Sequence, residues 1–191
     1  MSDPLPLPCP GGLAVGSLAQ ANRHKRKFDA VLTLEDPRAR PGERLRFTKN
    51  PAPFHLSLAF EDVDSDEFGY ASATADQVRI ALNFARQHAT GSLLVHCFHG
   101  VGRSAAIALA ILADRLGEGR EVEAVAELLA IRPEATPNLI VLSHADAILN
   151  RKGQLTNALS AFEQSRPDKL AARIRRHHYA RENPSLYAKR A

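Results

Sequence analysis

A cysteine and an arginine near the middle of the chain are separated by five residues, two of them glycine, in the run His96-Cys97-Phe98-His99-Gly100-Val101-Gly102-Arg103-Ser104. Glycines allow a tight loop whose backbone N–H groups turn inward and cradle an anion. An arginine fork can hold two oxygens of a phosphoryl group, and the start of a helix adds partial positive charge. The same field favours the ionised thiol, so we expect Cys97 to be a thiolate nucleophile at neutral pH. The run therefore predicts a phosphate site with a nucleophile at its centre.

The residues that flank this run predict the two elements that must position it. Leu93, Leu94 and Val95 form a short apolar stretch of the kind found in a central strand. Residues 105–116 are rich in alanine, leucine and isoleucine, and they predict a buried helix that ends at Gly117. A buried cysteine after a strand is by itself most often a small hydrophobic side chain. Here the arginine, the two glycines and the strand-to-helix junction together favour a catalytic role.

The rest of the chain predicts strands that alternate with helices. Apolar patterns predict strands over residues 12–17, 28–34 and 54–60, and helices over residues 74–88, 121–131 and from 137 to near 150. The acidic run from Glu61 to Phe68 is too charged for a core and predicts a solvated loop. We therefore expect an α/β fold in which a central mixed β-sheet is flanked by helices and a phosphate-binding loop joins a strand to a helix.

The composition predicts one globular domain over residues 1–164 and a basic C-terminal extension over residues 165–191. Hydrophobic residues make up 45% and charged residues 24% of the 191 residues, which excludes a disordered, collagenous or coiled-coil chain. The extension carries eight Lys or Arg and two acidic residues, whereas the body carries 17 basic and 19 acidic residues and has no overall positive field. For the extension we expect a solvated helix end or disorder; the alternative is contact with nucleic acid or an anionic membrane surface.

Two cysteines, Cys9 and Cys97, are too few for a disulfide framework or a four-cysteine zinc site. No apolar run is long enough to cross a bilayer, and residues 5–10 do not resemble a secretory signal. The histidines show no metal-ligand spacing. We therefore expect a cytoplasmic protein that holds no metal. A reversible disulfide between Cys9 and Cys97 has no support in the proline-rich surroundings of Cys9.

The pattern His96-Cys97-x-x-Gly100-x-x-Arg103-Ser104 resembles the signature loop of the protein tyrosine phosphatase superfamily, in the form found in its compact dual-specificity and bacterial members. The predicted strands at 12–17 and 28–34, with Arg132-Pro133 and Pro137-Asn138, extend the resemblance over residues 12–150. The resemblance implies hydrolysis of phosphomonoesters in two steps, without metal or cofactor. Cys97 would attack phosphorus to form a cysteinyl-phosphate, which water would then hydrolyse.

The resemblance also implies roles for the other residues of the loop. Arg103 and the loop amides would hold the phosphoryl oxygens as charge spreads in the transition state. The phosphate-binding residues would be Phe98, His99, Gly100, Val101, Gly102 and Arg103. Ser104 would donate a hydrogen bond to the sulfur and make the thiolate a better leaving group, and His96 would orient the loop from behind.

A general acid is also needed, because a phenolate or alkoxide leaves poorly without a proton. The superfamily takes it from an aspartate on a loop that follows a strand and precedes the cysteine. Asp62, Asp64 and Asp66 lie 35, 33 and 31 residues before the cysteine. The Phe-x-Asp pattern of several branches selects Asp62, whereas the Asp-x-x-x-Phe pattern of another branch selects Asp64. We take Asp62 as the first candidate for the catalytic acid, and the other two remain open.

The sequence therefore predicts a cysteine-dependent phosphatase, with phosphotyrosine as the expected substrate and dual specificity as an extension. Phosphorylated proteins or small phosphomonoesters would bind, and phosphate-like oxyanions would inhibit. The alternatives are a catalytically weak phosphate-binding or interaction module, an RNA 5′-phosphatase and a phosphoinositide phosphatase. Phosphoinositide-selective members tend to carry lysines inside the loop, and none lies between Cys97 and Arg103. RNA 5′-triphosphatases share Cys-x-His-Gly but continue with Asn-Arg-Thr-Gly, where this chain has Gly102-Arg103-Ser104-Ala105.

Overall fold

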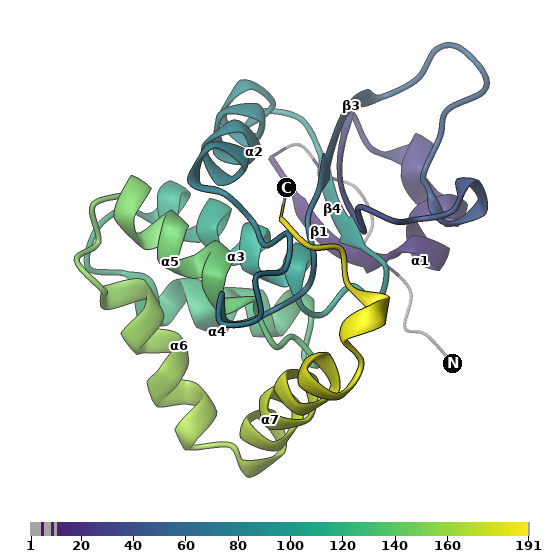
Figure 1. Cartoon of the computed structure of the whole chain (residues 1–191). Coiled ribbons are helices and arrows are strands. Elements are labelled where there is room, and N and C mark those ends of the chain that lie inside the picture. Colours follow the sequence, from purple (N-terminus) through teal and green to yellow (C-terminus); the bar gives the residue numbers. More distant parts are fainter. Residues whose placement is uncertain (1–4, 6–8, 10, 191) are drawn as a thin grey trace.

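Four parallel strands form the centre of the molecule in the computed structural model, which describes residues 5, 9 and 11–190 (Figure 1). The strands lie in the order β1-β4-β2-β3, with the bounds β1 Leu13–Ser17, β2 Ala30–Glu35, β3 Phe54–Ala59 and β4 Leu93–Cys97. All four had been predicted. These strands pair in parallel throughout, and not as the mixed sheet expected from the sequence. Each connection crosses over before the chain returns to the sheet, and such a crossover makes the next strand parallel.

Helices cover both faces of the sheet (Figure 1). Their bounds are α1 Leu18–His24, α2 Ala75–Gln87, α3 Arg103–Leu116, α4 Glu121–Ile131, α5 Leu139–Ile148, α6 Gln154–Gln164 and α7 Pro167–Glu182. Short 3-10 turns lie at Lys25–Lys27, Pro41–Glu43 and Pro184–Leu186. The predicted helices correspond to α2 to α5. A span of the length and apolarity that a bilayer requires is absent from the helices of the described residues.

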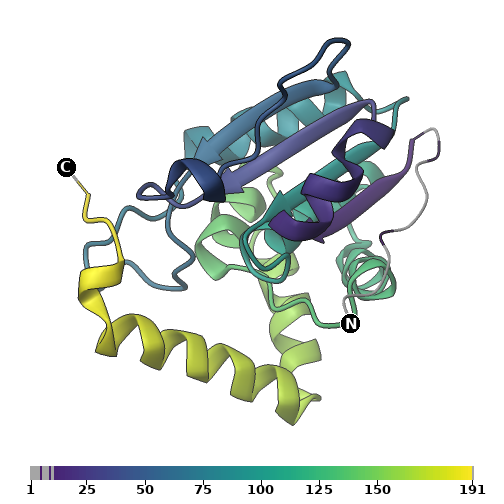
Figure 2. The same ribbon diagram turned by 90° about the vertical axis from the view of Figure 1, so that its right-hand side faces the viewer.

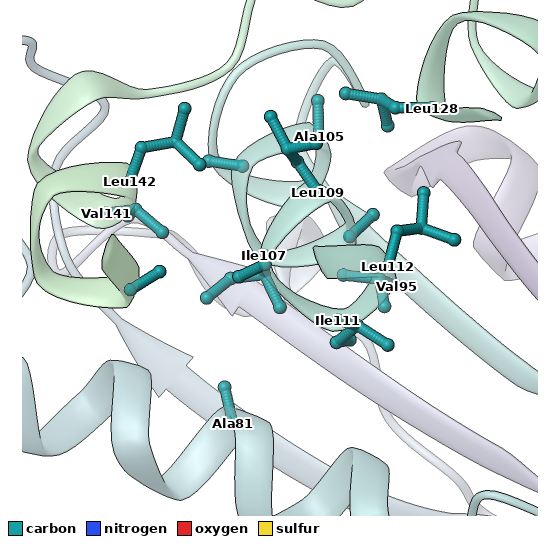
Figure 3. Close-up of a cluster of buried hydrophobic side chains, with 14 of the residues drawn as sticks. Ala81, Val95, Ala105, Ile107, Leu109, Ile111, Leu112, Leu128, Val141 and Leu142 are labelled. Carbon is teal, nitrogen blue, oxygen red and sulfur yellow. The ribbon is translucent and has the colours of Figure 1, made fainter. Parts of the chain in front are cut away.

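The central helix α3 is apolar on nearly all sides and is buried, as predicted. Residues 103–113 of this helix are all buried. In Figure 3, Ile107 lies on the side of Ala81 and Val141, whereas Leu109 lies on the side of Leu128. Full burial of each valine, leucine or isoleucine side chain in this cluster stabilises the fold by about 1.5–3 kcal/mol. This packing holds the first turn of α3, and therefore the loop before it, in a fixed place.

Side-chain caps define where three of these helices begin. Thr74 caps α2, because its hydroxyl accepts a hydrogen bond from the Gln77 backbone N–H at 3.2 Å. Ser17 forms the same reciprocal pair with the third helical residue of α1, a helix that we did not predict although its Ser-x-x-Gln signal is present. Asn138 caps α5 by accepting from the Val141 N–H at 3.0 Å.

The C-terminal segment departs most from the sequence-based prediction. Residues 165–190 are neither a solvated helix end nor disordered. After α7, the chain returns to the loop that joins β3 to α2 (Figure 2). The Tyr70 hydroxyl donates a hydrogen bond to the Ala180 carbonyl at 2.8 Å, and the Ala71 N–H donates to the Ala188 carbonyl at 2.8 Å. The prediction was wrong because it treated the basic segment alone, whereas its arginines meet the acidic run of the body.

The same contacts correct the prediction that the acidic run is solvated. Glu61 is 4% exposed and Val63 is 3% exposed. The Glu61 carboxylate accepts a hydrogen bond from the Ala188 N–H at 2.7 Å, and burial raises the pKa of this carboxyl above its usual range. Carboxylates can be buried here because backbone donors and arginines from the C-terminal segment replace water.

Candidate active site

The cysteine lies where the two central elements meet. Cys97 is the last residue of β4 and Arg103 the first residue of α3. The Cys97 side chain is buried, and its Sγ lies 3.2 Å from the Ser104 Oγ. The Gly100 backbone N–H donates to the same sulfur across 3.2 Å. The Gly100 N–H, and the Ser104 hydroxyl when it donates, would stabilise the sulfur as a leaving group.

Only glycine fits at position 100, for two reasons. Its φ is +79°, in the left-handed region that favours glycine. A Cβ at this position would lie 2.6 Å from the Gly16 carbonyl carbon and 2.7 Å from the Ser17 nitrogen. The loop is therefore pressed against the end of β1. From the other side the Arg132 Nε donates to the Gly100 carbonyl at 3.1 Å, and the loop is held between a strand and a guanidinium.

Arg103 lies under the loop with an unused donor. Its buried Nη1 donates to the Phe60 carbonyl at 2.8 Å and lies 3.0 Å from the Asp36 carboxylate. Within the described residues its buried Nε has no hydrogen-bond partner. A buried N–H without a partner costs free energy that an acceptor would recover. A phosphoryl oxygen would supply that acceptor and could also replace Asp36, which is 38% exposed.

The three candidate aspartates have different surroundings. Asp64 is almost completely enclosed, with its side chain 6% exposed, and both of its oxygens are bound by Arg176. Asp66 accepts from the Ser72 hydroxyl at 2.6 Å and pairs with Arg190, away from the loop. Asp62 alone of the three lines the pocket that Arg103 also lines. Asp62 therefore lies at the phosphate loop, whereas Asp64 and Asp66 pair with arginines of the C-terminal segment.

Asp62 lies directly against the loop. A Cβ at Gly102 would collide with the Asp62 carboxylate, so the glycine allows the two to touch. The Asn138 amide donates to Asp62 Oδ1 at 3.0 Å, and the Arg176 Nη1 lies 3.8 Å from the same oxygen. Burial acts to raise the pKa of Asp62, but the charges of Arg176 and Arg103, with the Asn138 hydrogen bond, hold it below its usual range.

His96 lies behind the loop and is neutral. It is 1% exposed, and its Nε2 lies 2.8 Å from the Thr33 hydroxyl, which lies equally close to His55 Nε2. Burial lowers the pKa of His96 to about 4. A neutral imidazole held by a neighbouring strand can fix the backbone at the nucleophile, and it adds no positive charge at neutral pH.

A pocket of about 290 Å³ opens beside the loop. Its lining residues are Asp36, Glu61, Asp62, Phe98, His99, Arg103, Arg176, Tyr179, Leu186 and Tyr187. The C-terminal segment thus contributes four of the lining residues and forms one wall. Cys97 is not on the wall, because its side chain is only 2% exposed and lies within the loop. Among the described residues, no three His, Cys, Asp or Glu side chains are grouped as metal ligands would be.

Sequence reasoning missed several residues of this site. Asp36 had a usable signal: it follows β2, and the carboxyl ends of parallel strands meet at one edge of a sheet. Arg132 and Asn138 were noted only as parts of the resemblance. Arg176 and Tyr187 had no signal, because nothing in the sequence pairs them with a loop more than 100 residues earlier.

Comparisons with known proteins identify the fold. No family model and no curated protein matches the sequence. Solved structures do match, among them DUSP15, at 19% identity over 85% of this chain and 97% of that one, with a TM-score of 0.54. The fold is that of the protein tyrosine phosphatase superfamily. The resemblance seen in the loop is therefore confirmed at the level of the fold, together with the α/β class.

Two further solved structures with this fold also match the chain. The human tyrosine phosphatase-like serine/threonine/tyrosine-interacting protein matches at 16% identity over 72% of this chain and 90% of that one, with a TM-score of 0.55. PTPMT1 in complex with PI(5)P matches at 19% identity over 75% of this chain and 95% of that one, with a TM-score of 0.53. At these identities the likeness concerns the fold, and the activity of this chain must be argued from its own residues.

Proposed function

We propose that the protein is a cysteine-dependent phosphatase that hydrolyses phosphomonoesters, with phosphotyrosine in proteins as its main substrate and dual specificity as an extension. The observation that supports the proposal is the environment of the Cys97 Sγ. This sulfur accepts a hydrogen bond from the Gly100 N–H and lies 3.2 Å from the Ser104 hydroxyl, next to a buried guanidinium with an unused N–H. A nucleophile, an anion cradle and a cation are the parts that phosphoryl transfer to sulfur requires.

The proposed reaction has two steps. The Cys97 thiolate attacks phosphorus while the bond from phosphorus to the ester oxygen breaks, and Asp62 gives its proton to that departing oxygen. Water then attacks the cysteinyl-phosphate, Asp62 takes a proton from it, and the thiolate and inorganic phosphate leave. Arg103 and the loop amides hold the phosphoryl oxygens in both steps, and Ser104 stabilises the departing sulfur by its hydrogen bond.

The walls of the pocket support an aryl ester over a multiply charged one. Phe98 is 44% exposed and Tyr179 is 53% exposed, and both line the pocket as surfaces on which an aromatic ring could pack. The carboxylates of Asp36 and Asp62 also line it and would repel further phosphate groups. A phosphoinositide, as in the PTPMT1 complex, and an RNA 5′ end both carry such additional phosphates. Arg173 and Arg176 of α7 are paired with acidic residues of this chain, so their charges add no support for an RNA substrate.

The rival function is a phosphate-binding or interaction module without turnover. The same residues would serve it, except that binding alone needs no nucleophile and no proton donor. The two functions are separated by an assay of p-nitrophenyl phosphate hydrolysis in the presence of EDTA. We expect steady release of p-nitrophenolate that vanadate inhibits. Binding of vanadate with no release of product would instead support the module.

Replacing Asp62 with asparagine is expected to lower kcat on phenyl phosphate by about 10²-fold, the usual contribution of a positioned acid. The loss on p-nitrophenyl phosphate should be much smaller, because its leaving group hardly needs a proton. Because the pKa of Asp62 is held low, its acid form is lost as pH rises through that low value. In the native protein, kcat/KM on phenyl phosphate should therefore fall with rising pH, starting below the usual range of a carboxyl.

The pH profile of Asp62→Asn checks the assignment. This variant should lose the alkaline fall and leave the rest of the profile unchanged. Asp66→Asn is the matched control, because Asp66 pairs with Ser72 and Arg190 and lies outside the pocket lining. Asp64→Asn tests the remaining candidate, whose two oxygens bind Arg176. A leaving-group dependence in Asp64→Asn and none in Asp62→Asn would move the acid to Asp64.

A further inference from the structure

Arg176 of α7 is the residue through which the C-terminal segment reaches the acidic loop. Its Nε donates to Asp64 Oδ2 at 2.8 Å, and its Nη2 donates to Asp64 Oδ1 at 2.8 Å. Its Nη1 donates to the Thr136 carbonyl at 2.9 Å. The guanidinium is thus fixed on two sides, and its Nη1 lies 3.8 Å from Asp62 Oδ1.

Asp64 in turn is anchored from three directions. Arg173 of α7 lies 3.0 Å from Asp64 Oδ1, and the Leu139 N–H at the start of α5 donates to that oxygen at 3.0 Å. The side chains of Arg173 and Arg176 are 11% and 17% exposed. A charge cluster this enclosed keeps its geometry, because releasing one member would leave another charged and buried.

Asp62 and Arg176 meet at the nucleophile loop. A Cβ at Gly102 would lie 2.8 Å from the Arg176 Nη1 and would collide with the Asp62 carboxylate. The arginine therefore stands on one side of the carboxylate, the loop lies against it, and the Asn138 amide donates to it from α5. Asp62 has little freedom to leave the mouth of the phosphate site while Arg176 is in place.

We propose that Arg176 is a positioning residue for the proton donor: it joins α7 to the acidic loop through Asp64 and holds the Asp62 carboxylate beside the phosphate loop. This inference rests on the proposed phosphatase function. Arg176 neither gives nor takes a proton. The proton moves from Asp62 to the ester oxygen, and Arg176 sets where the carboxyl stands and how readily it ionises.

The charge of Arg176 acts on Asp62 together with other groups. The charged and titratable groups around this carboxyl are Glu61 and Asp64 on its own loop, His99 and Arg103 at the phosphate loop, and Arg173, Arg176 and Tyr187 from the C-terminal segment. Burial and the charge of Asp62 raise the pKa of Tyr187 to about 12, so this phenol stays neutral. Among the cations, Arg176 is the strongest influence that keeps Asp62 ionised.

The test compares Arg176→Gln with Arg175→Gln, a change of the neighbouring, exposed arginine on the same helix. Arg176→Gln should lower kcat on phenyl phosphate at least about tenfold and lower it much less on p-nitrophenyl phosphate. The alkaline limb of its kcat/KM profile should move to higher pH, because removing a cation makes Asp62 harder to ionise. Arg175→Gln should show neither change.

A double-mutant cycle separates positioning from general damage. In the Asp62→Asn background, Arg176→Gln should add no further leaving-group dependence. Equal losses on both substrates, an unmoved pH limb, or effects that add fully to those of Asp62→Asn would each overturn the inference. If Arg176→Gln does not fold, Arg176→Lys serves, because it keeps the charge but loses the fork that binds Asp64. It should keep the native pH limb and still lose kcat on phenyl phosphate; native kcat there would overturn the inference.

Failure of the proposed phosphatase function can be distinguished from failure of the inference about Arg176. If the native protein hydrolyses neither aryl ester, the phosphatase proposal is wrong and Arg176 has no acid to position. If the native protein hydrolyses both esters and Asp62→Asn behaves as expected, only the inference about Arg176 is at stake.

Discussion

Replacing Cys97 with serine is expected to abolish turnover, by at least about 10³-fold in kcat, while oxyanion binding survives. A serine hydroxyl is hardly ionised at neutral pH, so the donors that hold the sulfur would face a poor nucleophile. The loop amides and Arg103 do not depend on the sulfur, and they should still hold vanadate. Hydrolysis of p-nitrophenyl phosphate and equilibrium binding of vanadate, measured on the same preparation, check both parts.

The control for this experiment is Cys9→Ser, which changes the other cysteine. Cys9 is exposed and lies outside the pocket lining, so its replacement should leave kcat unchanged. Undiminished turnover in Cys97→Ser would rule out the thiolate mechanism. Loss of both turnover and vanadate binding would mean that the substitution had disturbed the loop itself, and Cys97→Ala would then have to show binding without turnover.

Replacing Arg103 with lysine is expected to lower kcat by about 10²-fold or more and to weaken vanadate binding at the same time. Lysine keeps the charge, but it has no Nε–H in a planar fork, and that donor is the one left unpaired for a phosphoryl oxygen. Parallel measurements of kcat, the vanadate inhibition constant and the thermal midpoint of unfolding check this expectation.

Arg132→Lys is the matched comparison, because Arg132 is also buried beside the loop but is absent from the pocket lining. Its contacts are with the His99 and Gly100 carbonyls of the loop and with the side chains of Gln20 and Glu134. Arg132→Lys should lower the thermal midpoint of unfolding, whereas its affinity for vanadate should change little. A near-normal kcat in Arg103→Lys would show that Arg103 is structural.

The sequence was informative where local pattern decides structure. The strand-loop-helix unit around Cys97 was predicted correctly because an apolar strand, two glycines and an alanine-rich helix each carry a local signal. The predicted helix end at Gly117 is confirmed for the same reason. The mixed sheet was wrong, since the direction of a strand depends on how its connection crosses the sheet.

The sequence was uninformative where charges meet across the chain. Asp62, Asp64 and Asp66 are all aspartates at nearly the same distance along the chain from the cysteine. The sequence pattern therefore could not show which of them is the acid. Their contacts differ because Arg176 lies 112 residues from Asp64 along the chain and touches it in space. A basic segment considered alone suggests solvent or an anionic partner, whereas in the fold its counter-ions come from the acidic loop. The role of Asp62 remains a proposal that its kinetics can test.

The C-terminal segment is synthesised after the loop that it contacts. During synthesis the phosphate loop and α3 leave the ribosome well before the arginines of α7, and chains generally fold from the N-terminal side first. A nascent chain can therefore form the cradle around Cys97 while the acidic loop still lacks Arg173, Arg176 and the Ala188 contact. Such a chain should bind oxyanions before it can protonate a leaving group efficiently. Catalytic competence would then wait until residues 167–190 have been made and have packed against the loop.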